Sequence, residues 1–267
     1  MSEKQRADVA LVERGLCESR TKAQVSIMAG EVYVGTRRID KASELIKPED
    51  ELEIRGKSNP YASRGGLKLE KAITSFQADL RGKVCMDIGA ATGGFTDVCL
   101  QNGAAHVYAI DVGYGQFSWK LRNDPRVTVL ERVNARNLSP ELLGGCAADF
   151  ASMDVSFISV RTVLPAVRTC VREGAHLAVL VKPQFEARRE QVGKGGIVRD
   201  PQVHREVLLG VIAAVPGMGF APLGLAVSPI RGAEGNVEFL LHLRAGAAEP
   251  FDAEGAVETA LQAVDSV

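Results

Sequence analysis

A chain of 267 residues with 46% hydrophobic and 24% charged side chains has the composition of a globular protein, with one α/β domain and room for a small appendage. Its formal net charge of −1 excludes a uniformly basic surface but leaves room for a local basic face. Apolar runs stay short of the ~18 residues of a membrane helix, the N-terminus lacks the apolar core of a signal peptide, and the cysteines and histidines are scattered without metal-ligand spacing. We therefore expect a cytoplasmic protein without membrane or metal.

Residues 1–58 are dense in charge, and their pattern predicts a small α+β domain. Leu11, Val12 and Leu16 repeat on one helix face, and a second helix follows with Ser19 as its candidate N-cap. Short strands separated by turn signals complete the segment. Its basic side chains could gather on one surface, although acidic residues nearly cancel their charge; they are Arg6, Arg14, Arg20, Lys22, Arg37, Arg38 and Lys41.

Residues 59–66 are rich in Pro, Ser, Asn and Gly and predict a linker. From 67 to 245 apolar strands alternate with amphipathic helices, which is typical of a doubly wound, mostly parallel α/β sheet. A helix with Ser63 as its candidate cap comes first. We expect strands at 84–89, 106–111, 126–130, within 149–157, at 176–183, 223–228 and 237–243, and helices at 95–102, 160–171 and 203–215. Residues 246–267 form a small, acidic tail with a short helix at its end.

The segment DIGAATGGFT (87–96) joins the first strand of this domain to a helix. Gly89 permits a tight turn, while Gly93 and Gly94 let the backbone approach a ligand at the helix N-terminus. A dinucleotide fingerprint needs a third glycine where this chain has Ala91, so the pattern favours an adenosyl cofactor over a dinucleotide. Asp111 ends the second strand, where a carboxylate can accept hydrogen bonds from both ribose hydroxyls. Taken alone, such a turn also occurs for packing.

This turn resembles the first motif of Rossmann-like class I methyltransferases, most of all the FtsJ-type ribose 2′-O-methyltransferases, which use S-adenosyl-L-methionine. The resemblance implies that Gly93 and Phe95 line the methionine end, that Asp111 holds the ribose and that Asn134 lies near the adenine. The family commonly has Trp at the Phe95 position and Asp at the Asn134 position, so this chain departs from the pattern at both. The full set of cofactor-binding residues that the resemblance implies is Asp87, Gly89, Gly93, Gly94, Phe95, Asp111, Asn134 and Asp154.

The family's Lys-Asp-Lys-Glu tetrad is similar to Lys68, Asp154, Lys182 and Glu238, which occur here in the same order. A ribose hydroxyl is a poor nucleophile, and a lysine can take its proton only if the lysine pKa falls from ~10.4. Our hypothesis is that Lys182 is the base or orients the hydroxyl, that Lys68 lowers its pKa, and that the two carboxylates orient the ammonium groups. Singly, lysines and glutamates at strand ends usually lie in solvent.

The run GLCESRTKAQVSIMAGEVYVG (15–35) resembles the small RNA-binding domain of the ribosomal protein S-four type, which presents basic side chains to RNA phosphates. Joined to an FtsJ-type domain, it gives the architecture of the TlyA family, which is also called haemolysin A. Motifs such as VKPQFE (181–186) and SPIRGAEGNVEF (228–239) are similar to those of that family. Further candidate RNA contacts outside the small domain are Arg64, Arg188 and Arg189.

That resemblance implies methyl transfer to the 2′-hydroxyl of cytidine in ribosomal RNA, with ribosomal RNA or ribosomal subunits as partners. The substrate is the large-subunit RNA and, for the longer members that this chain is similar to, the small-subunit RNA as well. Two alternatives stay open: a non-catalytic assembly factor that binds ribosomal RNA, and a membrane-active haemolysin. The sequence leaves the target nucleotide and the oligomeric state open.

Overall fold

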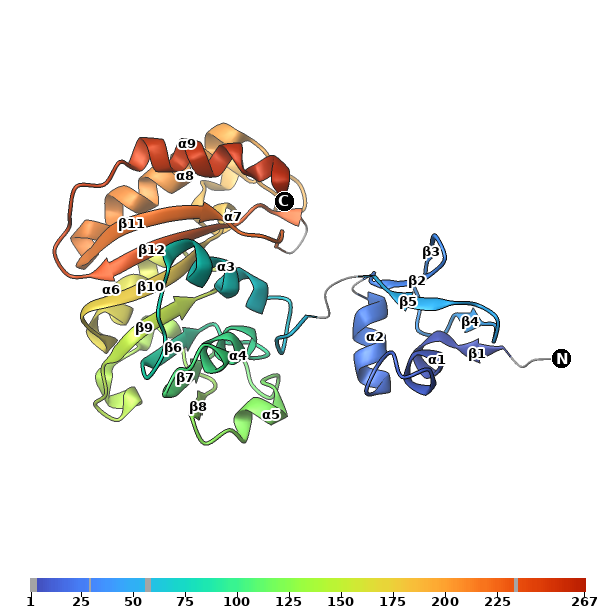
Figure 1. Cartoon of the computed structure of the whole chain (residues 1–267). Coiled ribbons are helices and arrows are strands. Elements are labelled where there is room, and N and C mark those ends of the chain that lie inside the picture. Colours follow the sequence, from blue (N-terminus) through green and yellow to red (C-terminus); the bar gives the residue numbers. More distant parts are fainter. Residues whose placement is uncertain (1–3, 29, 56–58, 233–234) are drawn as a thin grey trace. The chain divides into compact units, whose positions relative to one another are not determined.

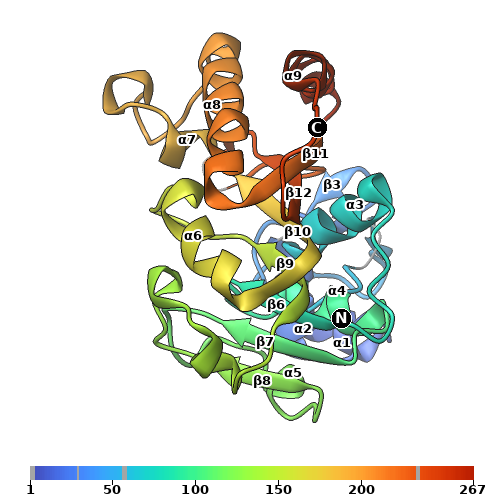
Figure 2. The same cartoon turned by 90° about the vertical axis from the view of Figure 1, so that its left-hand side faces the viewer.

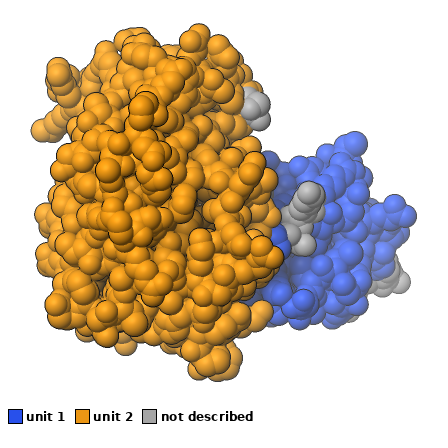
Figure 3. Space-filling view, turned by 60° about the vertical axis from the view of Figure 1, so that its left-hand side comes forward, with its two compact units in different colours: residues 1–60 blue, residues 61–267 orange. Residues whose placement is uncertain are grey.

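The computed structural model describes residues 4–28, 30–55, 59–232 and 235–267. The chain divides into two compact units, residues 1–60 and 61–267, which Figure 3 shows in different colours. Each unit has a hydrophobic core of its own. Within the described ranges, no helix combines the length and the apolar character needed to span a membrane.

The first unit is a small α+β domain, as predicted. Its elements are β1 (Gln5–Arg6), α1 (Ala7–Glu13), α2 (Arg20–Met28), β2 (Val32–Val34), β3 (Arg37–Arg38), β4 (Leu45–Ile46) and β5 (Leu52–Ile54). Strand β1 pairs with β4, and β2 pairs with both β3 and β5, all antiparallel. The hydroxyl of Ser19 accepts the Lys22 N–H at 3.3 Å, which confirms the predicted cap of α2. The apolar faces of α1 and α2 meet the strands in one core around Leu11 and Ile27.

The second unit alternates strands and helices around one sheet (Figure 1). The strands are β6 (Val84–Ile88), β7 (His106–Ile110), β8 (Val127–Leu130), β9 (Ala148–Met153), β10 (Val171–Val181), β11 (Phe220–Val227) and β12 (Phe239–Ala245). The α-helices are α3 (Gly66–Phe76), α4 (Gly94–Gln101), α5 (Trp119–Arg122), α6 (Val160–Cys170), α7 (Pro183–Glu186), α8 (Pro201–Ala214) and α9 (Ala253–Gln262). Short 3-10 turns lie at η1 (Ala135–Asn137), η2 (Pro140–Leu143), η3 (Arg189–Gln191), η4 (Val215–Met218) and η6 (Val264–Ser266).

The sheet has the strand order β11-β12-β10-β9-β6-β7-β8. Strands β8, β7, β6, β9 and β10 run parallel, while β12 is antiparallel to both of its neighbours. This confirms the mostly parallel sheet. Because β12 runs the opposite way, its first residue, Phe239, pairs with the last residue of β10, Val181. The start of β12 therefore lies at the same edge as the carboxyl ends of the parallel strands.

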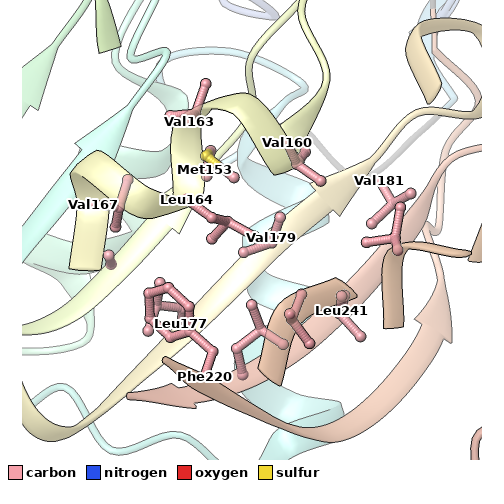
Figure 4. Packing of buried hydrophobic residues seen from close by; sticks show 14 of the residues in the cluster. Met153, Val160, Val163, Leu164, Val167, Leu177, Val179, Val181, Phe220 and Leu241 are labelled. Atoms are coloured by element: carbon pink, nitrogen blue, oxygen red, sulfur yellow. The ribbon is translucent and has the colours of Figure 1, made fainter. Parts of the chain in front are cut away.

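Successive residues of β10 enter cores on opposite faces of the sheet, which is the period-two pattern of a strand buried on both sides. Leu177 and Val179 pack on one face, and Ala178 and Leu180 pack on the other. Figure 4 shows the first of these cores, where apolar residues of α6 meet β10. Helix α3 contributes to the second core, and Figure 2 shows α6 and α3 on opposite sides of the sheet. The doubly wound arrangement is thus confirmed.

Two local predictions differ from the structure. Ser63 does not cap α3, because Gly65 is the N-cap and the Ser63 hydroxyl packs instead against Gly94 at the start of α4. Strand β10 begins at Val171, earlier than predicted, with an irregular register against β9 between Val171 and His176. In the C-terminal segment, the expected helix is present as α9, and its Val257 and Ala260 are buried in the larger core.

Candidate active site

The four charged residues of the predicted tetrad meet at the carboxyl edge of the sheet. Nζ of Lys68 lies 2.6 Å from Oε2 of Glu238 and 3.5 Å from Oδ2 of Asp154. Nζ of Lys182 lies 2.6 Å from Oδ1 of the same Asp154. The result is a nearly buried row in which carboxylates and ammonium groups alternate. The side chains of Lys68 and Lys182 are only 10% and 9% exposed, so water screens these charges little.

Each member reaches this row for a reason in the fold. Asp154 and Lys182 directly follow the neighbouring parallel strands β9 and β10, whose carboxyl ends share one edge. Glu238 directly precedes β12, and the antiparallel direction of this strand brings it to the same edge. Lys68 belongs to the first turn of α3, which packs on the sheet beside β10, β11 and β12. Ligands of open α/β sheets bind at this edge.

The charges around Lys68 decide its protonation. Burial by itself lowers the pKa of the Lys68 ammonium, but Asp154 and Glu238 outweigh that effect and leave the pKa above its ordinary value. Lys68 is therefore a fixed cation at neutral pH. Lys182 contacts one carboxylate of the tetrad, and its ammonium also donates to Oγ of Ser156 at 2.9 Å. The role of Lys182 as the base stays a prediction.

Ser156, Phe157 and Phe185 are site residues that the sequence reasoning did not single out. The Phe157 side chain is exposed (91%), although it lies beside the buried tetrad. Its φ of 63° is in the left-handed region, which is rare for a bulky residue. The rings of Phe157 and Phe185 lie 5.1 Å apart between centroids. The two phenylalanines lie in the motifs DVSFIS and VKPQFE, but exposure and backbone strain cannot be read from a sequence.

A cleft of about 510 Å³ lies next to the tetrad at the ends of β6, β7, β8 and β9. Four predicted residues border it, namely Gly89, Asp111, Asn134 and Asp154, and Ala91 of the turn borders it as well. The remaining lining comes from Ile110, Val112, Val133, Ala135, Arg136, Val155, Ser156, Phe157 and Ile158. The cleft is therefore walled by the loops after four parallel strands and combines apolar side chains with two carboxylates.

The polar groups of the cleft are held in place by the backbone. Oδ2 of Asp111 accepts the Ala91 N–H at 2.8 Å, and Oδ1 accepts the Gly113 N–H at 2.6 Å. Oδ1 of Asn134 accepts the Arg136 N–H at 3.1 Å. A carboxylate oxygen can accept more than one hydrogen bond, so Asp111 keeps free capacity toward a ribose hydroxyl.

Asp87 is fully buried behind this turn. Its Oδ2 accepts the Thr96 N–H at 2.8 Å and the Thr96 hydroxyl at 2.7 Å, which caps α4 in place of the missing side chain of Gly93. Its Oδ1 finds no hydrogen-bond partner among the residues that the structure describes. Burial, with smaller contributions from the charges of Asp154 and Asp111, raises the pKa of Asp87 to about 7. A cation bound nearby would offset the cost of ionising this buried carboxyl.

Besides Asp87, three predicted cofactor residues do not border the cleft, namely Gly93, Gly94 and Phe95. A Cβ on Gly93 would lie 2.6 Å from Cδ1 of Leu121, and one on Gly94 would lie 2.3 Å from Oγ of Ser63. These glycines are thus required by the packing of the chain against itself. Phe95 is 5% exposed and belongs to the apolar core on the α3 side of the sheet. A direct contact of these residues with the cofactor stays a prediction.

The candidate RNA-binding side chains of the first unit differ in their freedom. Arg6 and Arg20 both bind the buried carboxylate of Asp8, while remaining about half exposed at 45% and 59%. The Arg14 guanidinium donates to the carbonyls of Lys47 and Asp50, which engages it within the domain. The other predicted RNA contacts are exposed; they are Lys22, Arg37, Arg38, Lys41, Arg64, Arg188 and Arg189. Three of them form ion pairs: Lys22 with Glu18, Arg37 with Glu44 and Arg38 with Asp40. In the described part of the chain no cluster of His, Cys, Asp or Glu has the arrangement of a metal site.

Comparison with known proteins identifies both units. Residues 61–245 match the model of the FtsJ-like methyltransferases, and residues 5–52 match that of the S4 domain. TlyA of Mycobacterium tuberculosis, a 16S/23S rRNA (cytidine-2′-O)-methyltransferase, is 43% identical over 265 residues, which cover 99% of this chain and 98% of the relative. The chain belongs to the FtsJ-like methyltransferase family, in its TlyA group.

Other members of the group carry different names. YqxC of Bacillus subtilis, provisionally named an rRNA methyltransferase, is 53% identical over 91% of this chain and 86% of the relative. A solved structure described as a hemolysin from Streptococcus thermophilus is 44% identical, covers 100% of this chain and 98% of its own, and has a TM-score of 0.78. The family likeness found in the sequence is thereby confirmed, for both units.

Proposed function

We propose that this protein transfers a methyl group from S-adenosylmethionine to the ribose 2′-hydroxyl of cytidine in ribosomal RNA. One observation carries the proposal: a nearly buried row of two lysines and two carboxylates lies at the rim of a cleft of about 510 Å³. The name of the tuberculosis relative supplies the substrate, cytidine in the RNA of both ribosomal subunits. Because the two proteins align over nearly their whole lengths, we extend both RNA substrates to this chain.

The cleft suits S-adenosylmethionine. This molecule supplies a methyl group on a positively charged sulfonium, so little further activation of the donor is needed. Asp111 and Asn134 border the cleft with acceptors and a donor suited to a ribose and an adenine edge. Asp154 borders it too, and the unpartnered Oδ1 of Asp87 lies behind the turn, so the surroundings favour a cationic ligand.

The tetrad prepares the hydroxyl. In its neutral amine form, Lys182 Nζ takes the proton of the 2′-hydroxyl and becomes an ammonium, while Asp154 and Ser156 hold that nitrogen in a fixed direction. Lys68 stays charged and shares Asp154, which weakens the hold of this carboxylate on the proton of Lys182. Glu238, in turn, holds Lys68 in place at 2.6 Å. Removing either lysine side chain therefore disturbs both the alignment of the hydroxyl and the balance of charges within the tetrad.

The exposed ring of Phe157 suits an unpaired nucleobase. Stacking of a base on an aromatic side chain contributes ~1–3 kcal/mol, and enzymes that act on nucleotides of structured nucleic acid commonly take the target out of its stack. Phe157 borders the cleft and contacts Phe185 next to Lys182, so a base stacked there would leave its ribose near the tetrad. The basic side chains of the first unit supply affinity for RNA phosphates without specifying the sequence.

The deciding experiment is transfer of tritium from labelled S-adenosylmethionine to unmodified ribosomal subunits by the full-length protein. We expect label in alkali-resistant dinucleotides with wild type, a loss of at least 100-fold with Lys182→Ala, and little change with Lys71→Ala, a control at an exposed lysine of α3. Absence of label with wild type on either subunit, in a preparation that binds RNA, would reject the enzyme and favour an assembly factor.

A further inference from the structure

Two connecting segments at the carboxyl edge of the sheet are joined to each other by several contacts. One is the loop after β9, which contains Ser156 and Phe157, and the other follows β10 and contains Lys182 and, in α7, Phe185. Lys182 Nζ donates to Ser156 Oγ at 2.9 Å, and the two phenylalanine rings lie 5.1 Å apart. The first of these segments therefore sets where the exposed ring and the hydroxyl lie relative to the ammonium.

Glu186, the last residue of α7, also links the two segments, and its side chain is 1% exposed. Its Oε2 accepts the Ser159 hydroxyl at 2.7 Å and Nε of Arg161 at 3.2 Å. Its Oε1 accepts the Val160 N–H at 2.6 Å. These donors all lie at the start of α6, directly after the loop that follows β9 and contains Ser156 and Phe157, here called the Phe157 loop. Hydrogen bonds to a charged group are roughly twice as strong as those between neutral groups, so this carboxylate holds the loop firmly.

The Phe157 loop needs an anchor. A bulky residue in the left-handed region is strained and persists only where its surroundings hold it. At 91% exposure, the Phe157 side chain gains little from burial to offset this strain. On the downstream side the loop is held by Ser159 and Val160, and both donate to Glu186. A carboxylate is also favourable at a helix N-terminus such as that of α6.

We propose that Glu186 is a positioning residue that fixes Ser156 and Phe157 over Lys182 for the incoming nucleotide. This inference rests on the proposed function for its catalytic consequence, but the clamp itself is a property of the folded chain. Glu186 lies outside the predicted tetrad and does not border the cleft, so it acts through the loop that it holds. Without it, the loop relaxes and the ring no longer presents a base beside the ammonium.

The test compares Glu186→Ala with Glu190→Ala, which removes an exposed carboxylate a few residues further along. Amide hydrogen exchange of the segment 154–161 reports the loop, isothermal titration reports S-adenosylmethionine binding, and turnover on ribosomal subunits gives kcat and KM. For Glu186→Ala we expect faster exchange in this segment, a kcat at least 10-fold lower, and changes below 3-fold in KM for RNA. Cofactor affinity should fall by less than 5-fold, because the loop forms only one wall of the cleft. Glu190→Ala should match wild type throughout.

Two milder variants cover the case in which Glu186→Ala does not fold. Glu186→Gln keeps an acceptor for Val160, and Ser159→Ala removes a single donor, so both should fall between wild type and Glu186→Ala in exchange and in kcat. Unchanged protection of 154–161 in all three variants would reject the clamp, even if the wild type proved inactive on RNA. Loss of protection with unchanged kcat, or equal losses of kcat and cofactor affinity, would reduce Glu186 to a helix cap and reject the positioning role.

Discussion

The turn after β6 has glycine at position 89 because the chain leaves no room there for a side chain. A Cβ on Gly89 would lie 2.3 Å from the carbonyl oxygen of Asp154, and φ is +87°. Gly82 has a similar φ of +70° but open space around it. Spacing along the sequence correctly pointed to a tight turn, whereas the contact with Asp154 requires the neighbouring strand β9.

We therefore expect Gly89→Ala to destabilise the protein by more than about 2 kcal/mol, because backbone strain and overlap add. Gly82→Ala should cost only about 1 kcal/mol, since strain acts alone. Urea unfolding monitored by circular dichroism measures both. Equal losses in the two variants would show that the overlap with Asp154 is relieved without cost.

Asp8 holds two half-exposed arginines of the first unit, Arg6 and Arg20. Its carboxylate is 0% exposed and accepts from Arg6, Arg20 and Gln24. The hydrogen bonds from Arg6, opposed by burial and supported by Gln24 and Arg20, hold the pKa of Asp8 well below its usual range. A lowered pKa stabilises the fold above the unfolded value of ~3.9 and loses that contribution as the pH falls.

Asp8→Asn should destabilise the first unit by about 1–3 kcal/mol at pH 7, because it weakens charge-assisted hydrogen bonds in a buried site. The difference from wild type should shrink below pH ~4, where the Asp8 carboxyl of the unfolded wild-type chain begins to be protonated while the folded one is still ionised. Hydrogen exchange of α1 and α2 in the full chain measures this, with Asp40→Asn as an exposed control. A difference that grows on acidification would contradict the assigned direction.

At the scale of elements, an aromatic stack joins α3 to the sheet. Phe76 of α3 stacks on His242 of β12 at 4.7 Å, and His242 contacts His176 of β10 through ring nitrogens 2.9 Å apart. Burial, together with the charge of His176, lowers the pKa of His242 to about 4. Since α3 contains Lys68 and β12 begins after Glu238, this stack helps to hold the helix that brings one lysine into the tetrad.

A histidine whose pKa falls on folding is protonated first in the unfolded state, so stability rises with pH between about 4 and the unfolded value of ~6.5. Between pH 7 and pH 5, His242 should therefore account for a loss of about 2 kcal/mol. His242→Phe should keep the stack and remove most of that dependence. Urea unfolding at the two pH values measures it, and an unchanged pH dependence would rule out His242 as its source.

At the scale of the whole molecule, the two units have separate cores and contain different candidate functional groups. The first provides basic side chains, and the second contains the cleft and the tetrad. RNA affinity that comes from phosphate contacts falls with salt in proportion to the number of contacts. The proposed cofactor cleft, in contrast, is lined by residues of the second unit.

The double variant Arg6→Ala, Arg20→Ala should bind ribosomal RNA more weakly, with a salt slope smaller by about 1.5–2. Its affinity for S-adenosylmethionine should stay within 2-fold of wild type. Filter binding over a range of salt concentrations measures the first and titration calorimetry the second. Arg81→Ala, at an exposed arginine of the second unit, is the control. An unchanged slope would place the RNA contacts elsewhere.

Sequence by itself determined the order and type of the main elements, because apolar periodicity and turn residues are local signals. It also determined the family, through motifs that extend over both units. The element boundaries were predicted less well. Ser63 has the right residue type for a helix cap, but its hydroxyl packs against Gly94 instead.

Tertiary structure alone decided how the candidate site is assembled. The pairing of β12 with β10 brings Glu238 beside Lys182, and Asp154 is shared by both lysines because of where α3 packs. The exposure of Phe157 and the burial of Glu186 depend on contacts between loops after different strands. Such contacts join residues far apart in the chain, so no local pattern records them.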